Sequence, residues 1–216
     1  MLDWNPTTHY KDVGVAERYD RERFSSIPGR VFNALEKSCV RKAFCDVSRK
    51  APILDVPTGT GRLAEVLLDD GFSVTGVDIS QPMLEVARRK LAHHGARFEP
   101  RVADVRELAN KEPKFYEAAL CARVLMHFPL QEQVQFLGSV TRLTRKRVVF
   151  NQSLSTPYQR LRRGMKRLLG NQPPAGYPIS EAQLAELLAG AGLREIGRLR
   201  PMALVSEAIY VVAEPL

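Results

Sequence analysis

The sequence predicts an α/β protein: a doubly wound, mostly parallel sheet of seven strands with an antiparallel strand near the C-terminus, preceded by a helical cap. Three observations support this class. Short apolar runs alternate with helical patterns between about residues 52 and 151, a glycine-containing turn follows the first run, and two further apolar runs close the chain. The alternation favours parallel strands joined by helices, and the closing pair adds the antiparallel strand.

The elements are expected in a simple order. Residues 1–50 form the helical cap, in which Pro28-Gly29-Arg30 opens one helix. Strands are predicted at 52–56, 73–78, 97–103, 116–122, 147–151, 193–198 and 205–213. Helices are predicted at about 61–70, 82–93, 105–110, 130–143 and 180–191. Residues 51–216 then make the main domain, which carries a basic insert at about 152–178.

Composition restricts the class of protein. The 216 residues are 44% hydrophobic and 26% charged, which is ordinary for a globular chain. No apolar stretch approaches the roughly 20 residues of a membrane span, and residues 1–10 lack the pattern of a secretion signal, so a cytoplasmic protein is expected. Three cysteines without a C-x-x-C pair, and four histidines without ligand spacing, predict neither a disulfide framework nor a metal site.

The turn after the first strand indicates a nucleotide site. Gly59 and Gly61 permit backbone angles and a close ligand approach that a Cβ would block. Asp78, at the end of the second strand, is placed to accept hydrogen bonds from ribose hydroxyls. The sequence from Gly59 to Ala64 also satisfies the dinucleotide-binding pattern G-x-G-x-x-G/A, so an NAD(P)-binding oxidoreductase is one alternative.

Asp55 argues against a dinucleotide. A carboxylate at the mouth of the turn repels a pyrophosphate, whereas it suits a ligand with an ammonium and a sulfonium group, as in S-adenosylmethionine. The chain also lacks a second nucleotide-binding half, which a dinucleotide requires.

The segment Leu54-Asp55-Val56-Pro57-Thr58-Gly59-Thr60-Gly61 resembles motif I of the class I S-adenosylmethionine-dependent methyltransferases, an acid followed by G-x-G-x-G. Pro57 replaces the first glycine, a familiar variant. The resemblance covers about residues 50–213 and is of the small-molecule or lipid-acceptor type. It implies a Rossmann-like methyltransferase fold, S-adenosylmethionine as cofactor and in-line transfer of its methyl group. A non-catalytic protein that binds the same cofactor stays a second alternative.

The resemblance also implies a set of cofactor-binding residues. The turn cradles the methionine part, with Asp55 near the ammonium, and Asp78 holds the ribose. The full set is Tyr19, Arg23, Asp55, Pro57, Thr58, Gly59, Thr60, Gly61, Asp78, Ile79, Met83, Asp104, Val105, Ala122 and Arg123. Three of these have a structural alternative: Met83 as helix core, Asp104 as a helix cap, and Tyr19 with Arg23 on a charged surface helix.

His127 is the candidate general base, because an unperturbed imidazole is mostly neutral at pH 7 and can take a proton from an acceptor. A structural histidine that closes the loop is the alternative. The segment lacks the N/D-P-P-Y/F sequence of enzymes that methylate amino groups of nucleic acids or glutamine.

The basic insert bears on the acceptor. Between Gln133 and Ser180 there are nine basic residues and no acidic one, so this stretch carries the whole net charge of +8. A helical arrangement of residues 157–169 places apolar side chains opposite five basic ones, namely Arg160, Arg162, Arg163, Lys166 and Arg167. The segment is interpreted as a lid over the substrate, a contact with an anionic membrane surface, or a phosphate-binding patch. The acceptor is then small or lipid-linked, with an anionic group as one option. Nucleic acid is disfavoured because interleaved aromatics are missing.

Overall fold

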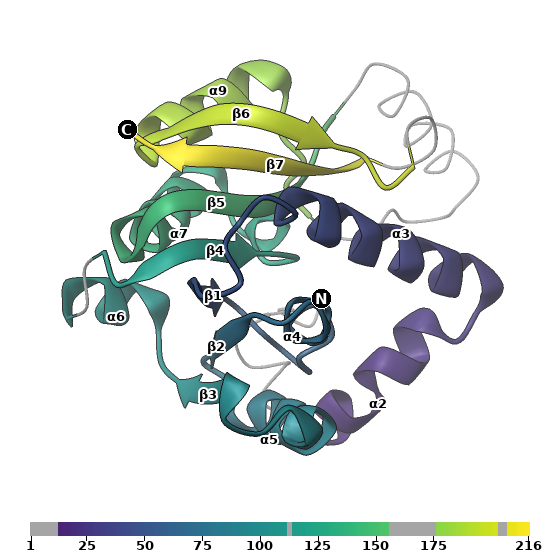
Figure 1. Cartoon of the computed structure of the whole chain (residues 1–216). Coiled ribbons are helices and arrows are strands. Elements are labelled where there is room, and N and C mark those ends of the chain that lie inside the picture. Colours follow the sequence, from purple (N-terminus) through teal and green to yellow (C-terminus); the bar gives the residue numbers. More distant parts are fainter. Residues whose placement is uncertain (1–12, 112–113, 156–175, 203–206) are drawn as a thin grey trace, which may run out of the picture.

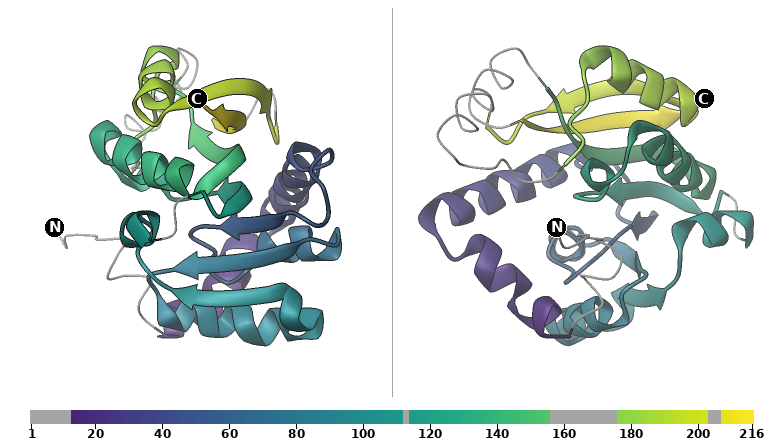
Figure 2. Two further views of the ribbon diagram at one scale, coloured as in Figure 1. Left: turned by 60° about the vertical axis from the view of Figure 1, so that its left-hand side comes forward. Right: turned by 180° about the vertical axis from the view of Figure 1, so that it is seen from behind.

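The seven strands lie in the order β3-β2-β1-β4-β5-β7-β6 in a computed structural model that describes residues 13–111, 114–155, 176–202 and 207–216. All neighbours are parallel except β7, which is antiparallel to both β5 and β6. Helices cover both faces of the sheet (Figures 1 and 2). The predicted doubly wound sheet with one antiparallel strand is therefore confirmed.

The strands match the predicted apolar runs to within a few residues. They are β1 (Pro52–Asp55), β2 (Ser73–Asp78), β3 (Phe98–Val102), β4 (Tyr116–Cys121), β5 (Thr144–Ser153), β6 (Leu193–Leu199) and β7 (Ala208–Pro215). The largest difference is at β5, which is longer than the expected 147–151. It pairs with β4 from Thr144 and with β7 as far as Ser153, so its neighbours extend it at both ends.

The helices of the described residues are α2 (Val13–Phe24), α3 (Ile27–Ala43), α4 (Ala64–Asp69), α5 (Gln81–Leu91), α6 (Val105–Lys111), α7 (Leu130–Leu143) and α9 (Glu181–Gly190), with short 3₁₀ helices η1 (Ala92–Arg97) and η2 (Leu125–His127). The helix predicted from residue 61 begins only at Ala64, because Gly61 has a φ of 72°, which a right-handed helix does not allow. None of these helices has both the length and the apolar character needed to cross a bilayer.

Two hydrophobic clusters, one on each face, hold the layers together. Neighbouring strand residues point to opposite faces, so Leu54 joins the cluster with α6, α7 and α9, whereas Ile53 joins the cluster with α3, α4 and α5. The cap helix α3 contributes Cys39, Val40 and Ala43 to the second cluster. The division between cap and main domain at residue 50 stays a prediction.

The predicted basic insert lies mostly outside the described residues. Of its described ends, Ser153 is the last residue of β5, and Leu154 forms a parallel bridge with Ile179; the insert itself stays a prediction. Arg160, Arg162, Arg163, Lys166 and Arg167 all belong to residues 156–175, which are not described.

Candidate active site

A pocket opens at the carboxyl ends of β1, β2 and β4, where adjacent strands lead to helices on opposite faces of the sheet. Its cavity of about 280 Å³ is close to the lower end of the roughly 300–1,000 Å³ typical of small-molecule sites. Predicted residues that line it are Tyr19, Asp55, Pro57, Thr58, Gly59, Thr60, Asp78, Ile79, Met83, Asp104, Val105, Ala122, Arg123 and His127. Gly61 and Arg23 are not among the lining residues.

The two glycines of the turn have different physical roles. A Cβ built on Gly59, whose φ is 54°, meets no atom within 4 Å, so this position leaves space for a ligand. A Cβ on Gly61 would lie 2.6 Å from Leu91 Cδ1 and 3.1 Å from Ala87 Cβ. The missing side chain of Gly61 therefore lets the turn pack against α5, and an approach of the cofactor to Gly61 stays a prediction.

Asp55 lies at the floor of the pocket and is almost completely buried. Its Oδ2 accepts a hydrogen bond of 2.6 Å from Thr58 Oγ1. Burial raises the pKa of the carboxyl to about 7, and the nearby Asp78 adds to the rise, whereas Thr58 and Arg62 oppose it. A cationic ligand group beside this carboxyl would favour its ionised form.

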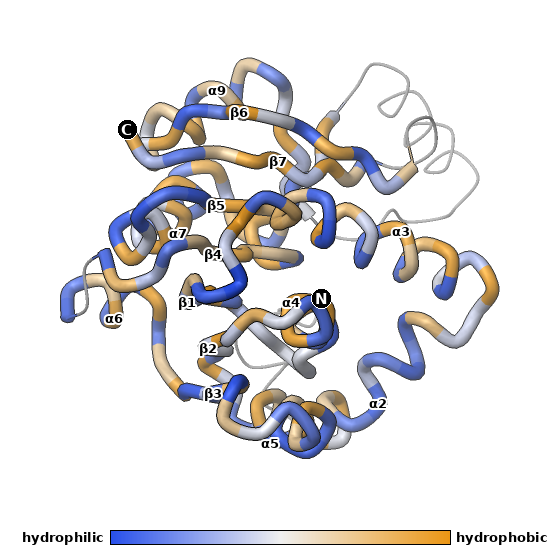
Figure 3. Tube along the Cα trace, in the orientation of Figure 1, coloured by the Kyte–Doolittle hydropathy of each residue, from blue (hydrophilic) through white to orange (hydrophobic). Residues whose placement is uncertain are grey.

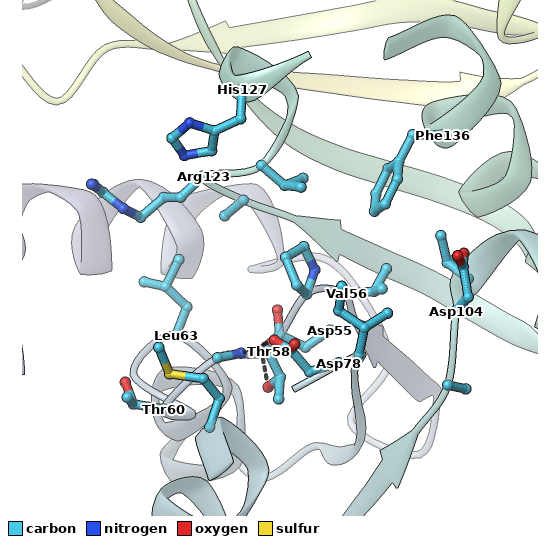
Figure 4. A pocket seen from close by; sticks show the side chains of 18 of the residues that line it. Asp55, Val56, Thr58, Thr60, Leu63, Asp78, Asp104, Arg123, His127 and Phe136 are labelled. Carbon is cyan, nitrogen blue, oxygen red and sulfur yellow. Dashed lines mark hydrogen bonds between the residues drawn. The ribbon is translucent and has the colours of Figure 1, made fainter. Parts of the chain in front are cut away.

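Asp78 is held by backbone donors. Its Oδ2 accepts from the Gly59 N–H and its Oδ1 from the Ser80 N–H, both at 2.9 Å. Burial raises the pKa of Asp78, and these hydrogen bonds counteract the rise. The Asp78 carboxylate therefore fixes the turn at Gly59 while it faces the pocket, and Figure 4 draws it close to Asp55 and Thr58.

Asp104 lies on the side of the pocket near α6 and is engaged by Arg106. The Arg106 backbone N–H, Nε and Nη2 donate to its carboxylate at 2.9, 3.0 and 2.7 Å. A carboxylate that accepts a backbone N–H at the start of α6 agrees with the alternative in which Asp104 caps the helix. The hydrogen bonds from Arg106 also lower the pKa of Asp104. An additional bond from Asp104 to adenine stays a prediction.

His127 ends η2 and lines the same pocket. Burial lowers its pKa to about 4, with further contributions from the positive charges of Arg123 and Arg23. The ring is therefore neutral at pH 7. Arg23, though not on the pocket wall, has its guanidinium carbon 6.0 Å from the centroid of the Tyr19 ring.

Several lining residues were not predicted: Val56, Arg62, Leu63, Ala103, Arg106, Val124, Phe128, Glu132 and Phe136. Glu132 and Phe136 are four residues apart on α7 and so share a helix face, a pattern that could have indicated them. The ring centroids of Phe128 and Phe136 lie 5.9 Å apart, and the two side chains form an aromatic wall of the pocket. Figure 4 places Phe136 across the pocket from His127.

One group of metal-ligand types occurs among the described residues, away from the pocket. Asp69, His93 and His94 bring their ligand atoms within 4.8 Å of one another, which their sequence spacing does not indicate. Arg97 Nη2, however, lies 3.0 Å from His94 Nδ1. A guanidinium only donates, so the neutral ring carries its proton on Nε2, the atom that faces Asp69 at 3.4 Å.

The pocket fits S-adenosylmethionine in its chemistry. Gly59 leaves room beside the turn, Asp55 offers an acidic group to an ammonium, and Asp78 lies within reach of a ribose on the same side. An acceptor could enter between His127 and the aromatic wall.

Comparisons with known proteins agree with this geometry. A family model described as a methyltransferase domain matches residues 53–147. The ubiquinone biosynthesis O-methyltransferase of Nitrosomonas europaea is 27% identical over 202 residues, covering 90% of this chain and 78% of that protein. The match to the protein of the same name from Bordetella bronchiseptica is 31% identical but spans 47% of this chain and 42% of the relative.

Solved structures share the whole fold at low identity. Magnesium protoporphyrin IX methyltransferase from Synechocystis PCC 6803, with bound SAH, has a TM-score of 0.78 at 17% identity and covers 97% of this chain and 98% of that one. The 1,6-didemethyltoxoflavin-N1-methyltransferase of Burkholderia thailandensis has a TM-score of 0.68 at 18% identity, over 100% and 92% of the chains. The match over residues 53–147 and the shared fold make this chain similar to the class I S-adenosylmethionine-dependent methyltransferases, with S-adenosylmethionine as its cofactor and methyl transfer as its reaction.

Proposed function

We propose that the protein methylates a hydroxyl oxygen on a small aromatic acceptor. The observation that carries this proposal is the neutral His127 on one side of the pocket, opposite Phe136, whose ring lies beside that of Phe128. Aromatic side chains favour a planar ring between them and the cofactor. The curated relatives named above support oxygen as the methylated atom.

The chain's own residues have three tasks in this reaction. S-adenosylmethionine, when bound, supplies an electrophilic methyl group. Asp55, Gly59 and Asp78 hold the cofactor, and the aromatic wall orients the acceptor for in-line attack and excludes water. His127 receives the hydroxyl proton as the oxygen attacks.

A histidine with a pKa of about 4 is a weak base, so its surroundings have to assist. The positive charges of Arg123 and Arg23 that lower the pKa of His127 also stabilise negative charge developing on an acceptor oxygen beside it. The same field therefore acidifies the hydroxyl. A weak base combined with a positive field suits a phenol better than an aliphatic alcohol, because the oxyanion of an aliphatic alcohol is much harder to form.

The test is methyl transfer from labelled S-adenosylmethionine to matched acceptors. We expect label on a catechol or other phenol, and none on the corresponding aniline or O-methylated phenol. His127→Ala should lower kcat by about 10²- to 10⁴-fold, the usual contribution of a positioned acid–base group, with little change in cofactor affinity. Transfer to the aniline alone would refute oxygen methylation. Cofactor binding without label transfer to any component of a cell extract would support the alternative of a non-catalytic binding protein.

A lipid-linked acceptor is the second part of the proposal. It is supported by the basic composition of the insert, in which Arg160, Arg162, Arg163, Lys166 and Arg167 face away from an apolar stripe if residues 157–169 are helical. A cytoplasmic protein that touches an anionic membrane surface would meet such an acceptor there. Vesicle flotation should show binding to anionic vesicles that weakens when Arg162, Arg163, Lys166 and Arg167 are neutralised. Unchanged association would exclude electrostatic anchoring by these residues.

A further inference from the structure

A buried carboxylate on the cap helix α3 connects three distant parts of the chain. Glu36 has no exposed surface. It accepts hydrogen bonds from Arg62 Nη2 at 2.9 Å, from Tyr210 Oη at 3.0 Å and, more loosely, from Arg123 Nη1 at 3.4 Å. Asn33, one turn earlier on α3, accepts from Arg62 Nη1 at 2.6 Å. A fully buried, multiply bonded glutamate is uncommon, because an ionised carboxylate has to be paired inside a protein.

The two arginines occupy informative positions. Arg62 follows Gly61 at the end of the cofactor turn, and Arg123 follows β4 by two residues and precedes His127 by four. Both line the pocket, whereas Glu36 does not. Their guanidinium carbons lie 4.5 and 6.0 Å from the centroid of the Phe24 ring on α2. Glu36 thus reaches both sides of the pocket through one guanidinium each.

Backbone geometry adds a second, independent sign of constraint. Arg123 is one of two described non-glycine residues with positive φ, at 64°. Such a conformation persists where the surroundings hold it in place. Tyr19, Glu36 and the Phe24 ring contact the Arg123 side chain and help to hold it.

The charges in this cluster are unequal, because two guanidinium groups share one carboxylate. Removal of Glu36 would leave the buried Arg62 and the partly buried Arg123 without a counter-charge in the cluster. Their field would then act more strongly on Asp55, whose pKa Arg62 already lowers, and on His127, whose pKa Arg123 already lowers.

We infer that Glu36 is a positioning residue for methyl transfer: it holds Arg62 at the cofactor turn and Arg123 beside His127, and so couples the N-terminal helices to both halves of the site. This inference rests on the proposed function for the role of His127. The coupling to the cofactor turn does not depend on the acceptor.

Three variants test the inference. Glu36→Gln removes the charge, and Glu36→Asp keeps the charge but shortens the side chain. The matched control is Glu65→Gln, which breaks the ion pairs of Glu65 with Lys37 on α3 and with Lys90 on α5; Glu65 does not line the pocket. Glu36→Asp guards against loss of folding, because its carboxylate still compensates the arginines.

Two measurements that need no acceptor give the decision. We expect affinity for S-adenosylhomocysteine, measured by calorimetry, to fall about tenfold or more in both Glu36 variants and to stay within about twofold in Glu65→Gln. We also expect the His127 titration midpoint, followed by NMR, to fall in Glu36→Gln and to stay at its wild-type value in Glu65→Gln.

Glu36→Asp that binds S-adenosylhomocysteine as tightly as Glu65→Gln would overturn the inference, and so would Glu36→Gln that leaves the His127 midpoint unchanged. If Glu36→Gln does not fold, Glu36→Asp alone decides it. Failure of the proposed function is seen separately, as wild-type protein that binds S-adenosylhomocysteine but methylates no hydroxyl.

Discussion

At the scale of single residues, replacing either glycine of the cofactor turn by alanine should cause a different main defect: weaker cofactor binding at Gly59 and lower stability at Gly61. Gly59→Ala should lower the free energy of unfolding by about 1–2 kcal/mol, the cost of a left-handed backbone, with no added clash because its Cβ meets no neighbour. The added methyl group would, however, occupy space that the cofactor needs. Gly61→Ala should cost that amount and a further 1–3 kcal/mol for the clash with Leu91. Urea unfolding and calorimetry with S-adenosylhomocysteine measure the two effects.

The expected result is a binding defect with modest instability for Gly59→Ala, and the larger loss of stability for Gly61→Ala. If Gly59→Ala binds as tightly as wild type, the cofactor does not approach the turn at that position.

Asp55 predicts that cofactor binding depends on pH. Its pKa of about 7 means that the carboxyl is mostly protonated at pH 6 and mostly ionised at pH 8, and the ionised form attracts the cationic cofactor. Affinity for S-adenosylmethionine should therefore rise with pH over this window, and binding at pH 7 should release protons. Asp55→Asn should bind weakly with little pH dependence. Calorimetry in buffers of different ionisation enthalpy measures both quantities; an equally steep pH profile in Asp55→Asn would assign the titration to another group.

The same pKa has a consequence for folding. Burial raises the folded-state pKa of Asp55 above its unfolded value of about 3.9, so the folded state holds the proton more tightly. The stability contributed by this group is present below about pH 4 and is lost as pH rises through 7. Asp55 therefore opposes folding in the pH range where it serves the cofactor.

At the scale of elements, α2 is attached to the cofactor turn mainly by polar contacts. It buries only Ala16 and Phe24, and Figure 3 colours most of it as hydrophilic. Asp20 accepts from Thr60 Oγ1 at 2.9 Å and from Lys90 Nζ at 3.4 Å. These polar contacts are few and only partly buried, and α2 buries little apolar surface, so α2 should open more easily than α3.

Hydrogen exchange tests this expectation. Amides of α2 should exchange faster than those of α3 in ligand-free protein, and S-adenosylhomocysteine should slow them if α2 closes on the turn. Asp20→Asn should accelerate exchange in α2 without changing the urea midpoint. Equal protection of α2 and α3 in ligand-free protein would contradict a weakly held α2.

Elements were easier to predict from the sequence than the full site. Buried strands such as β1 and β4 are nearly continuous apolar runs, and Asp55, Gly59 and Asp78 follow from a local pattern. The start of α4 was misplaced, because a helical pattern does not reveal the positive φ of Gly61. Glu36 was missed for a different reason: a glutamate on a charged helix resembles a solvent-facing residue until Arg62, Arg123 and Tyr210 surround it. Those partners come from segments far apart in the chain, and no local pattern encodes their meeting.

At the scale of the whole molecule, the pocket joins parts that belong to different hydrophobic clusters. Its walls come from β1 and β2, from the segment after β4, from α7 and from α2. A ligand that contacts all of them binds the folded state alone and stabilises it by mass action. At a concentration 100 times its Kd, S-adenosylhomocysteine should add about 2.7 kcal/mol, which corresponds to a rise in Tm of about 5–10 °C for a chain of this size.

Asp78→Ala should remove most of that rise, because it deletes both a cofactor contact and the acceptor of the Gly59 N–H. The shift should also grow with the logarithm of ligand concentration, which separates specific binding from a solvent effect. Thermal scans of wild type, Asp78→Ala and the control Glu65→Gln over a range of ligand concentrations measure it. A shift that is equal in wild type and Asp78→Ala would place the cofactor outside the pocket at β1, β2 and β4. If Glu65→Gln keeps the ligand-induced rise in Tm, the stabilisation by the ligand depends on the pocket and not on the surface contacts between α3 and α4.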